Sequence, residues 1–592
     1  MFFKELPGVF LRWRIRHLSS GNFTLLLSAL VGVLAGLAAG LLKELVHTVQ
    51  FLLRFRLHAD WGFFFDYLYP TAGILLTVWV ARYLLRDTPG HGVTDVLYDI
   101  SKRSSLIRPL RTYSRMITSA ITVGFGGSVG LEAPIVVTGS AIGSNLARWF
   151  RLDYKARTIL IGCGAAGAIA GIFNSPVAGM IFSGEVILAG FGFASFIPLL
   201  IAAVAGSLVS LILLGDDTLF KFVLRDPFGA ADVPYYIMLG VLCGLISVYF
   251  TRVNYFVEAW MAKIHSPWLK AVRGGLALAI ILFVFPPLFG EGYDTIKTLL
   301  DSEGKEIIYQ SFFSLNYNNA LVFGLFLLGI VIAKPFATSL TLASGGSGGV
   351  FAPALFLGGV TGFLFAFSFN MFVPGLYCSP SNFALVGMCG VMSGVLHAPL
   401  TAIFLIAEIT NGYTLFVPLM LVSAISFSTI SYFEKYSIYT KHLIERGDYS
   451  PHDKDKQLLG AISVHKVVER DLLTVRPDQK LENLVELIKT SHRNIFPVVD
   501  SEKRLHGIIT LDDVRDIMFD EDMRKRVAVS SIMNEAPALV SMNDSMQTVM
   551  NKFERTGAWN LPVLEDGLYV GFVSKSRIFN AYRSRLQWDR AD

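Results

Sequence analysis

The uncharged apolar stretches of this chain constrain its fold more than any other feature. Residues 335–407 contain no Asp, Glu, Lys or Arg, and residues 158–215 contain a single such residue, Glu185. Stretches of this length belong in lipid, where an unpaired charge is costly. Only 16% of the 592 residues are charged, against roughly a quarter in soluble domains. From about residue 450 onward the sequence is typical of a soluble protein, so we expect a membrane part followed by a soluble part.

A cluster of arginines near the N-terminus indicates the orientation of the membrane part. Arg12, Arg14 and Arg16 lie just before the first long apolar run, which begins near Phe23. Positive charges flank transmembrane segments on the cytoplasmic side. We therefore expect residues 1–22 to be a cytoplasmic segment of a multi-pass protein of the cell membrane. We find no cleavable signal-peptide pattern before the run.

The four cysteines lie in or beside apolar stretches, without the spacing of metal ligands. We expect them to pack in the core, and we predict no metal site. These residues are Cys163, Cys243, Cys378 and Cys389.

Two segments of the membrane part recur in the same order. Residues 126–134 are GGSVGLEAP and residues 345–353 are GGSGGVFAP, 219 positions later. Residues 164–186 and 387–409 form a second pair, in which a glycine ladder ends at a proline and a glutamate follows nine residues later. The prolines and glutamates of this pair are Pro176 and Pro399, and Glu185 and Glu408. The membrane part is therefore predicted to consist of two related halves.

Glycines and prolines inside apolar segments predict helices that break within the membrane, as in transporters. A helix that begins there presents unpaired N–H groups and a partial positive charge. Two such helix starts that converge form an anion site without a lysine or arginine. No Lys or Arg lies close in sequence to either GGS motif. We expect this absence to favour release of the anion, since a fixed cation binds it tightly.

One glycine pattern inside the repeat imitates a dinucleotide-binding fingerprint. Gly162, Gly164 and Gly167 form G-x-G-x-x-G, and Glu185 follows at about the distance of a ribose-binding acid. However, Pro176 falls inside the supposed strand–helix unit. Small residues at this spacing also let membrane helices pack closely. We therefore favour helix packing over nucleotide binding, and we expect no enzymatic activity.

Six segments of the membrane part match, in order, the motifs of one known family. They are GHGV at 90–93, GLEAP at 130–134, FNSPVAG at 173–179, GVFAP at 349–353, HAPLTAIFLIAEIT at 397–410 and SIYT at 437–440. With them the chain resembles the CLC family of chloride channels and chloride/proton exchangers over about residues 23–443. The resemblance implies an all-α polytopic membrane domain with broken helices and inverted repeats. It also implies a homodimer with one anion pathway in each subunit.

The resemblance assigns roles to single residues. Glu132 matches the family's gating glutamate, which occupies the anion site when ionised and is expected to swing away when protonated. Val350 and Phe351 match backbone N–H donors to the central chloride, and Tyr439 matches a tyrosine whose hydroxyl contacts that ion. His91 stands where the family usually has a chloride-binding serine, which puts selectivity among halides and nitrate in question. The alternatives are a structural N-cap for Glu132, an interfacial position for Tyr439 and a helix cap for His91.

Other departures from the family concern the gate and proton handling. Leu131 and Ala133 replace the commoner Arg and Gly, which predicts a more apolar setting for the gating glutamate. Exchangers usually carry a second, proton-receiving glutamate, but that position falls on Val186, which cannot bind a proton. This favours passive conduction, with water or another acid as the alternative proton source. We expect Glu185 and its repeat partner Glu408 to be structural hydrogen-bonding groups.

The soluble part contains a second repeat. Residues 444–460 are charged and contain a proline, which is typical of a linker. Beyond it, residues 494–514 align with residues 559–578, and each has two strand-like runs followed by a helix start. The two units resemble a tandem CBS pair with an α+β fold. We place the first CBS domain at 461–522 and the second at 523–592.

Tandem CBS pairs often bind an adenine nucleotide through a Thr/Ser-x-x-Asp motif. Thr510 and Asp513 fit this motif, whereas Ser574 and Arg577 occupy the matching positions of the second unit. The alternative is a structural dimerising module without a ligand. Thr510 and Asp513 are therefore candidate nucleotide-binding residues, and transport is expected to need no cofactor.

The sequence thus predicts transmembrane chloride transport through a pathway gated by a glutamate, as a passive channel gated by voltage or pH. The nearest alternative is a proton-coupled chloride antiporter on the same fold. A CBS-regulated divalent cation channel needs carboxylates along its pore, and the long acid-free stretches argue against it. The expected partners are chloride and other small anions, a second copy of the chain and the lipid bilayer, without nucleic acid. We expect the N-terminus and the CBS pair to be cytoplasmic.

Overall fold

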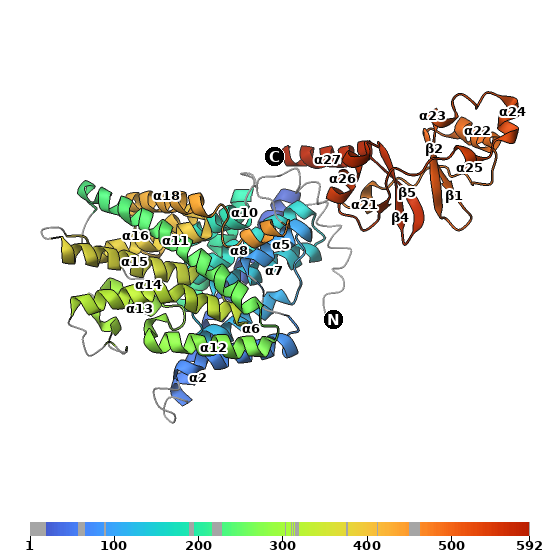
Figure 1. Cartoon of the computed structure of the whole chain (residues 1–592). Helices are drawn as coiled ribbons and strands as arrows, with labels where there is room; N and C mark the ends of the chain where they lie inside the picture. The colour runs from blue at the N-terminus through green and yellow to red at the C-terminus, as the bar shows by residue number, and fades with distance from the viewer. Residues whose placement is uncertain are drawn as a thin grey trace. The chain divides into compact units, whose positions relative to one another are not determined.

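The structure is a computed structural model that divides the chain into two compact units, Met1–Tyr449 and Ser450–Asp592 (Figure 1). The first unit is helical, and the second combines helices with short strands. His91 and the predicted N-terminal arginine cluster lie outside the described residues. The structure describes residues 19–56, 66–87, 90, 92–188, 195–215, 228–301, 304–308, 311, 313, 319–373, 377–410, 412–448 and 462–590.

Eight helices among these described residues are long and apolar enough to cross a membrane. They are α2 (Ser20–Arg56), α8 (Tyr154–Phe173), α10 (Phe196–Leu214), α11 (Val233–Ala262), α12 (Pro267–Val284), α14 (Ala320–Ala343), α15 (Phe351–Phe372) and α18 (Phe416–Phe433). The first unit is thus an all-α polytopic membrane protein, as its uncharged stretches predict.

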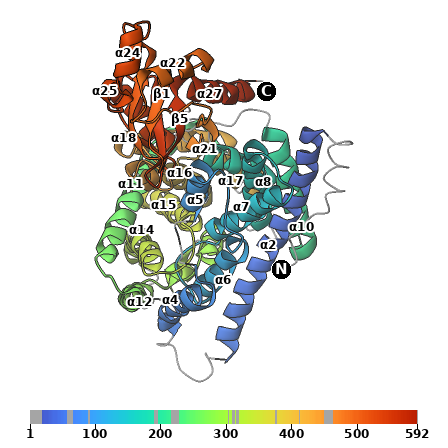
Figure 2. The same ribbon diagram turned by 90° about the vertical axis from the view of Figure 1, so that its right-hand side faces the viewer.

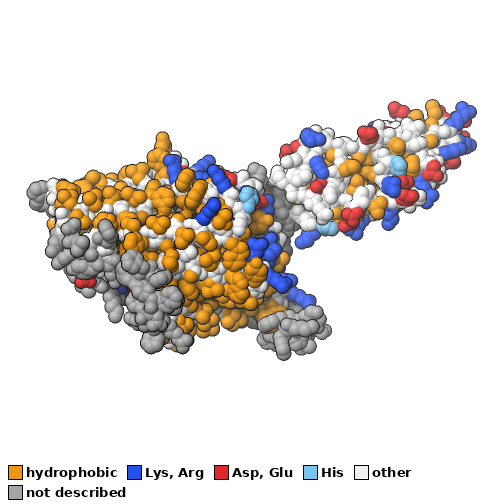
Figure 3. Space-filling model, turned by 60° about the horizontal axis from the view of Figure 1, so that its bottom comes forward, with side chains coloured by type: hydrophobic (Ala, Val, Ile, Leu, Met, Phe, Trp, Pro, Cys, Tyr) orange, Lys and Arg blue, Asp and Glu red, His pale blue; other side chains and the backbone are white. Residues whose placement is uncertain are grey.

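The surface of the first unit is apolar over much of its area. Figure 3 shows hydrophobic side chains over most of the face of this unit that is in view, and mixed charges on the second unit. Ile212 of α10 and Ile280 of α12 are 80% and 68% exposed. Large aliphatic side chains this exposed are stable when they face lipid instead of water.

The helices of the two related halves correspond element by element. In the first half they are α6 (Arg111–Gly124), α7 (Glu132–Trp149), α8 and α9 (Pro176–Phe182), and in the second α14, α15, α16 (Pro380–Leu396) and α17 (Pro399–Ile409). Both α7 and α15 begin directly after a glycine-rich loop, and both α9 and α17 begin at a proline. The interrupted segments therefore form the broken helices that the repeat predicts.

Reciprocal hydrogen bonds join the two glycine-rich loops. The Ser347 N–H donates to Thr122 Oγ1 at 3.0 Å, and the Ser128 N–H donates to Thr341 Oγ1 at 3.3 Å. Each serine and each threonine is 219 positions from its counterpart. Such an exchange relates the halves by an approximate twofold axis through the site where the loops meet.

The glycine ladder of α8 packs helices together and does not have the strand–turn–helix geometry of a dinucleotide-binding fingerprint. Gly162, Gly164 and Gly167 all lie inside one continuous helix. A Cβ on Gly164 would overlap the carbonyl oxygen of Gly139, and one on Gly167 would meet the backbone of Gly32. Figure 2 shows α2, α8 and α10, which pack against one another. All four cysteines are buried, as predicted.

Shorter elements connect these helices and shape the site. They are α4 (Tyr69–Trp79), the π-helical turns η2 (Val80–Leu84) and η3 (Ser183–Ile187), α5 (Val93–Lys102), α13 (Tyr293–Asp301), α19 (Lys441–Glu445) and the 3₁₀ turns η1 (Asp66–Leu68), η5 (Ala230–Asp232), η6 (Pro286–Leu288) and η7 (Lys305–Ile308). The loop from η6 to α13 reaches the glycine-rich loop of the first half, because the Gly290 N–H donates to the Gly126 carbonyl at 3.0 Å.

The second unit contains two small sheets and their helices. In the first sheet β1 (Ile495–Val499) pairs antiparallel with β2 (Leu505–Thr510), and Ile495 lies opposite Thr510. In the second, β3 (Val540–Ser541) pairs parallel with β4 (Asn560–Glu565), which pairs antiparallel with β5 (Leu568–Ser574). The helices are α21 (Val464–Val467), α22 (Leu481–Thr490), α23 (Leu511–Val514), α24 (Glu521–Arg526), α25 (Val529–Ile532), α26 (Met546–Thr556) and α27 (Lys575–Arg590).

The cores of the two repeats interleave along the chain. Val464 and Val467, near the start of the unit, pack into the core of the second repeat with Phe553. Val529, which follows the first repeat in sequence, packs into the first core with Phe496. The two repeats are therefore one folding unit, because each core takes residues from the segment that leads into the other repeat.

Candidate functional site

Two helix starts with the same backbone geometry meet at the centre of the first unit. Leu131, before α7, has φ −88° and ψ −10°, and Val350, before α15, has φ −93° and ψ −2°. Their loops are joined by a pair of hydrogen bonds, from Gly130 N–H to the Gly349 carbonyl at 2.9 Å and from Gly349 N–H to the Gly130 carbonyl at 2.8 Å. The first N–H groups of both helices lack intrahelical partners and carry partial positive charge. The meeting point is therefore suited to an anion.

Glu132 places a carboxylate at this meeting point. Its side chain is 2% exposed, and Oε1 accepts a hydrogen bond from the Tyr293 hydroxyl at 2.7 Å. Oε2 is buried and makes no hydrogen bond of ordinary geometry within the described residues. The N–H groups of Glu132 and Ala352 lie close enough to stabilise its negative charge. Glu132 is the first helical residue and not the N-cap, which is Leu131, so its side chain is directed at the shared site and does not cap α7.

Gly130 leaves the room that this carboxylate occupies. A Cβ on Gly130 would overlap Oε2 of Glu132 and press on the Cβ of Ala352 in α15. The carboxylate is thus folded back over its own glycine, between the starts of α7 and α15. No larger residue at position 130 is compatible with this arrangement.

Polar groups from a distant segment of the chain lie beside Glu132. The loop between α12 and α13 supplies Glu291, whose Oε1 accepts a hydrogen bond from the Leu131 N–H at 3.2 Å. Tyr293, which donates to Glu132, is the first residue of α13. These partners lie about 160 positions away in sequence, so the neighbours Leu131 and Ala133 gave no indication of them.

The structure also corrects the expectation that no cation lies near the glycine-rich motifs. Lys334 of α14 is fully buried, and its Nζ donates to Ser128 Oγ, inside the first motif, at 2.9 Å. The same ammonium lies 4.6 Å from the centre of the Phe356 ring. Lys334 and Ser128 are 206 positions apart, so no local motif indicated this contact. One feature of the sequence nevertheless pointed to Lys334. Lys334 is the single Asp, Glu, Lys or Arg between Glu306 and Glu408, and a lone charge in an apolar stretch marks a functional or paired position.

A cavity of about 490 Å³ opens beside the site. Its lining includes Val350 and Tyr439, two of the predicted chloride-binding residues. Tyr439 is 5% exposed, and its carbonyl accepts a hydrogen bond from Thr94 Oγ1 at 2.9 Å. Phe351, the third of these residues, is buried and stacks on Phe173 with ring centres 5.3 Å apart.

The charges that line this cavity are mostly positive. Arg82 and Lys270 are among the lining residues, together with two histidines. The acid in the lining is Glu258, whose Oε2 lies 3.0 Å from Nε2 of His442. A cavity with this balance attracts anions, whereas a pathway for divalent cations needs unpaired carboxylates.

The two glutamates of the second repeat motif anchor helix starts of the opposite half. Glu185 accepts from the N–H groups of Leu400 and Thr401 at 3.2 and 2.9 Å and from the Thr401 hydroxyl at 2.7 Å. Glu408 accepts from the N–H groups of Val177 and Ala178 at 3.0 and 2.9 Å. These contacts agree with the prediction of structural hydrogen-bonding groups. The neighbouring Val186, in η3, is half-buried and packs against the apolar core.

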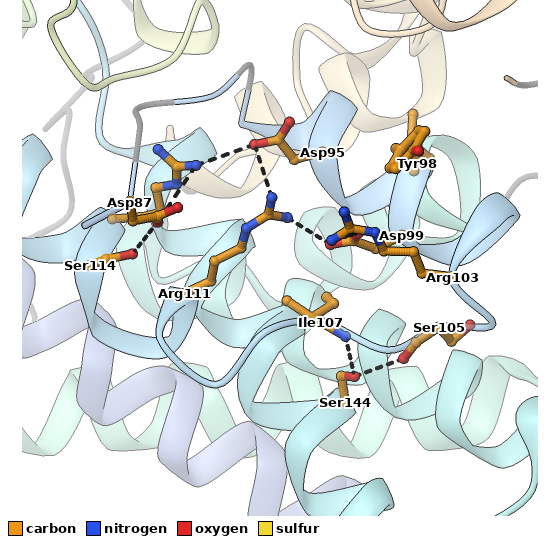
Figure 4. A network of polar contacts seen from close by, with 12 residues as sticks. Asp87, Asp95, Tyr98, Asp99, Arg103, Ser105, Ile107, Arg111, Ser114 and Ser144 are labelled. Atoms are coloured by element: carbon orange, nitrogen blue, oxygen red, sulfur yellow. Dashed lines mark hydrogen bonds and ion pairs between the residues drawn. The ribbon is translucent and has the colours of Figure 1, made fainter. Parts of the chain in front are cut away.

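A network of acids and arginines holds α5 against α6 (Figure 4). Arg111 Nη1 lies 2.6 Å from Asp99 Oδ2, and Arg115 Nη2 lies 3.4 Å from Asp95 and 3.9 Å from Asp87. The start of α5 is thereby fixed beside the loop of the GHGV motif. A Cβ on Gly90, in that loop, would overlap the Asp95 carboxylate.

The comparisons with known proteins agree with this geometry. The family described as voltage gated chloride channel matches residues 73–431, more than half of the chain, and the CBS domain matches residues 453–520 and 529–584. The chain belongs to the voltage gated chloride channel family. Its predicted family, its fold class and its tandem CBS region are thus confirmed.

Within the family, a relative named as a chloride channel and one named as an exchange transporter are equally similar to this chain. The chain is 28% identical over 484 residues to the chloride channel protein CLC-f of Arabidopsis thaliana, covering 72% of this chain and 60% of the relative. It is 28% identical over 428 residues to the H(+)/Cl(-) exchange transporter ClcA of Vibrio cholerae, covering 67% of this chain and 84% of the relative. A slow cyanobacterial Cl-/H+ antiporter has the same fold, with TM-score 0.62, 24% identity and coverage of 73% of this chain and 99% of that chain.

In the CBS region, Thr510 and Asp513 contact each other. Asp513 Oδ2 accepts from the N–H and the hydroxyl of Thr510, both at 2.6 Å, and Oδ1 accepts from Asn534 Nδ2 at 3.0 Å. Thr510 and Asp513 thus form a capping box at the start of α23.

Proposed function

We propose that this member of the voltage gated chloride channel family carries chloride and other small anions across a membrane through a passive pathway gated by Glu132. One observation carries the proposal: the Glu132 carboxylate lies where the starts of α7 and α15 converge. Helix starts stabilise a negative charge without a fixed cation. The carboxylate therefore occupies a place that suits a chloride ion equally well.

The gate works by competition for this place. An ionised Glu132 fills the anion site itself and closes the pathway. A protonated Glu132 no longer gains from the helix N–H groups, so it leaves and an anion enters. Val350 and Phe351 N–H groups and the Tyr439 hydroxyl are the proposed chloride ligands, with His91 as a further donor. Basic residues of the cavity, such as Lys270, concentrate anions at the entrance.

The passive mechanism rests on Val186, because an apolar side chain packed in the core cannot take a proton from the cytoplasmic side. The second candidate is a proton-coupled chloride antiporter. It is favoured by the acid group around Glu132, in which Tyr293 and Glu291 offer another set of proton-binding groups. The similarity to relatives named as H(+)/Cl(-) exchange transporters also supports this second candidate.

The deciding experiment uses the purified protein in liposomes with an outward chloride gradient and a clamped membrane potential. Chloride efflux and external pH are recorded together. We expect chloride efflux without coupled proton movement. Proton uptake against its gradient, driven by chloride efflux, makes the protein an antiporter instead. The absence of any anion flux contradicts both mechanisms.

The soluble unit is proposed to regulate the pathway from the cytoplasm and to bind an adenine nucleotide at Thr510 and Asp513. The test is calorimetric titration of the full chain with ATP. We expect Asp513→Ala to lose binding and Asp512→Asn, which is exposed and outside the capping box, to keep it. Equal binding by all three proteins, or none by the wild type, contradicts the assignment.

We further propose that two copies of the chain associate and that both the N-terminus and the CBS pair are cytoplasmic. Light scattering of the purified protein in detergent measures the first point, and a monomeric mass contradicts it. Protease added outside intact cells tests the second, and cleavage within residues 462–590 contradicts it.

A further inference from the structure

Two carboxylates share the start of one helix. Glu291 accepts from the Leu131 N–H at 3.2 Å, and Glu132, the next residue along α7, accepts from the Tyr293 hydroxyl at 2.7 Å. The two acids are close enough to repel each other when both are ionised. Carboxylates that share a site in this way bind protons jointly, because each negative charge favours the neutral form of the other.

The opposing charges come from two further helices. Within the described residues, Lys43 of α2 interacts with both acids, and Lys334 of α14 interacts with Glu291. Together with Tyr293 of α13, these are the titratable groups that face Glu291 from the elements packed around it. The two lysines favour the charged forms of the acids, and the acids disfavour each other. The charge of Glu132 therefore depends on the charge of Glu291.

Glu291 lies on the side of the gate that faces away from the cavity. The cavity is lined by Lys270 near the start of α12, whereas Glu291 follows the end of that helix. The 18 residues of α12 separate these ends by about 27 Å, at 1.5 Å per residue. Glu132 is between them, since Ala133 lines the cavity and Leu131 contacts Glu291.

Solvent reaches the two acids unequally. Glu291 is partly exposed, whereas Glu132 is 2% exposed. A proton from the solution on this side thus meets Glu291 first. His442, near the end of the first unit, lines the cavity, so with the proposed cytoplasmic location of the chain that follows, the solution at Glu291 is the external one.

We propose that Glu291 is the external proton sensor of the gate: its charge sets the external pH at which Glu132 leaves the anion site. The inference rests on the proposed anion transport and assigns a positioning residue to it. An ionised Glu291 raises the pH at which Glu132 becomes neutral, and loss of that charge lowers this pH. Lys334 acts through Glu291, because its charge favours the ionised form of that acid.

The test measures chloride flux of the full chain in liposomes against external pH. Glu291→Gln keeps an oxygen to accept from the Leu131 N–H but removes the charge. We expect its pH of half-maximal flux to move about one unit lower, a typical size for a nearby like charge. Lys334→Met is expected to move the same pH downward by a smaller amount, because without this ammonium Glu291 is ionised over a narrower pH range. Asp294→Asn is the matched control, because it removes an exposed charge from the first turn of α13 and leaves the profile unchanged.

The Glu291→Gln substitution made in the Glu132→Gln protein separates a role in gating from a general effect on the fold. In Glu132→Gln the gate has no charge to control, so adding Glu291→Gln must not change the pH profile. A wild-type pH profile in Glu291→Gln, or an equal shift in the presence and absence of Glu132, overturns the inference. If the wild type carries no anion at any pH, the proposed function fails first. If the wild type carries anions and the pH profile of Glu291→Gln is unshifted, the sensor role of Glu291 is contradicted and the proposed function still stands.

Discussion

The two halves of the membrane unit begin their central helices with the same backbone and opposite side-chain chemistry. Glu132 and Phe351 are 219 positions apart, and each is the first residue of its helix. Glu132 bonds to Tyr293, whereas the ring of Phe351 packs on the rings of Phe173 and Phe182. A repeated backbone thus provides two equivalent anion-binding helix starts. One substitution makes one of them a titratable group and leaves the other as a fixed set of N–H donors.

The buried cations of the two halves show the same divergence. Arg115 of α6 and Lys334 of α14 also lie 219 positions apart. Arg115 is paired with two aspartates that are themselves largely buried, Asp87 and Asp95. Lys334 contacts a serine hydroxyl and an aromatic ring and has a glutamate nearby. The first cation holds the structure, and the second lies beside a group that changes its charge.

The largest expected effect is a loss of stability, and it tests the comparison of the two buried cations. Arg115→Met removes the cation that lies 3.4 Å from Asp95 and 3.9 Å from Asp87, and losing one member of a buried ion pair costs about 3–5 kcal/mol. Lys334→Met removes a buried charge along with its contacts, so we expect a cost of about 1 kcal/mol. Denaturant unfolding of the two purified variants in detergent measures both. Equal costs contradict the division between a structural cation and one that acts on the gate.

The next effect tests the two helix starts. Glu132→Gln is expected to abolish the pH dependence of chloride flux, because the side chain loses its titratable charge. Phe351→Leu keeps the backbone N–H groups and is expected to retain the pH dependence and flux within about threefold, with about 1 kcal/mol of stability lost through altered packing. Flux assays at several external pH values compare them. Chloride flux that still depends on pH in Glu132→Gln contradicts the role of Glu132 as the gate. A Phe351→Leu variant that folds normally but carries no chloride contradicts the view that position 351 contributes only its backbone N–H.

The smallest effect concerns the two anchoring glutamates. Glu185 accepts three hydrogen bonds and Glu408 accepts two. Removing the charge at a helix start costs about 1 kcal/mol, so Glu185→Gln is expected to be slightly more destabilising than Glu408→Gln. Thermal unfolding measures this difference. Neither variant is expected to alter proton movement during chloride flux, and an altered proton movement in Glu185→Gln alone identifies Glu185 as a proton carrier.

Local motifs predicted the parts of the site that lie on the repeated loops. The GGS motifs and the prolines located the helix breaks, and the position of Glu132 at one of them follows from the sequence. Tyr293, Glu291 and Lys334 were not predicted. Their contacts span 161, 160 and 206 positions, and neither a motif nor a periodicity connects such distant residues.

The sequence by itself determined that the chain spans a membrane, that its membrane part has two related halves and that a carboxylate begins one central helix. These properties follow from apolar length, repetition and the local geometry of glycine and proline, all of which are encoded within a few residues. Only the tertiary structure decided which groups surround that carboxylate. Its proton and ion equilibria depend on groups that folding brings together from α2, α13, α14 and the loop before α13, because electrostatic energy is set by distance in space and not by distance along the chain.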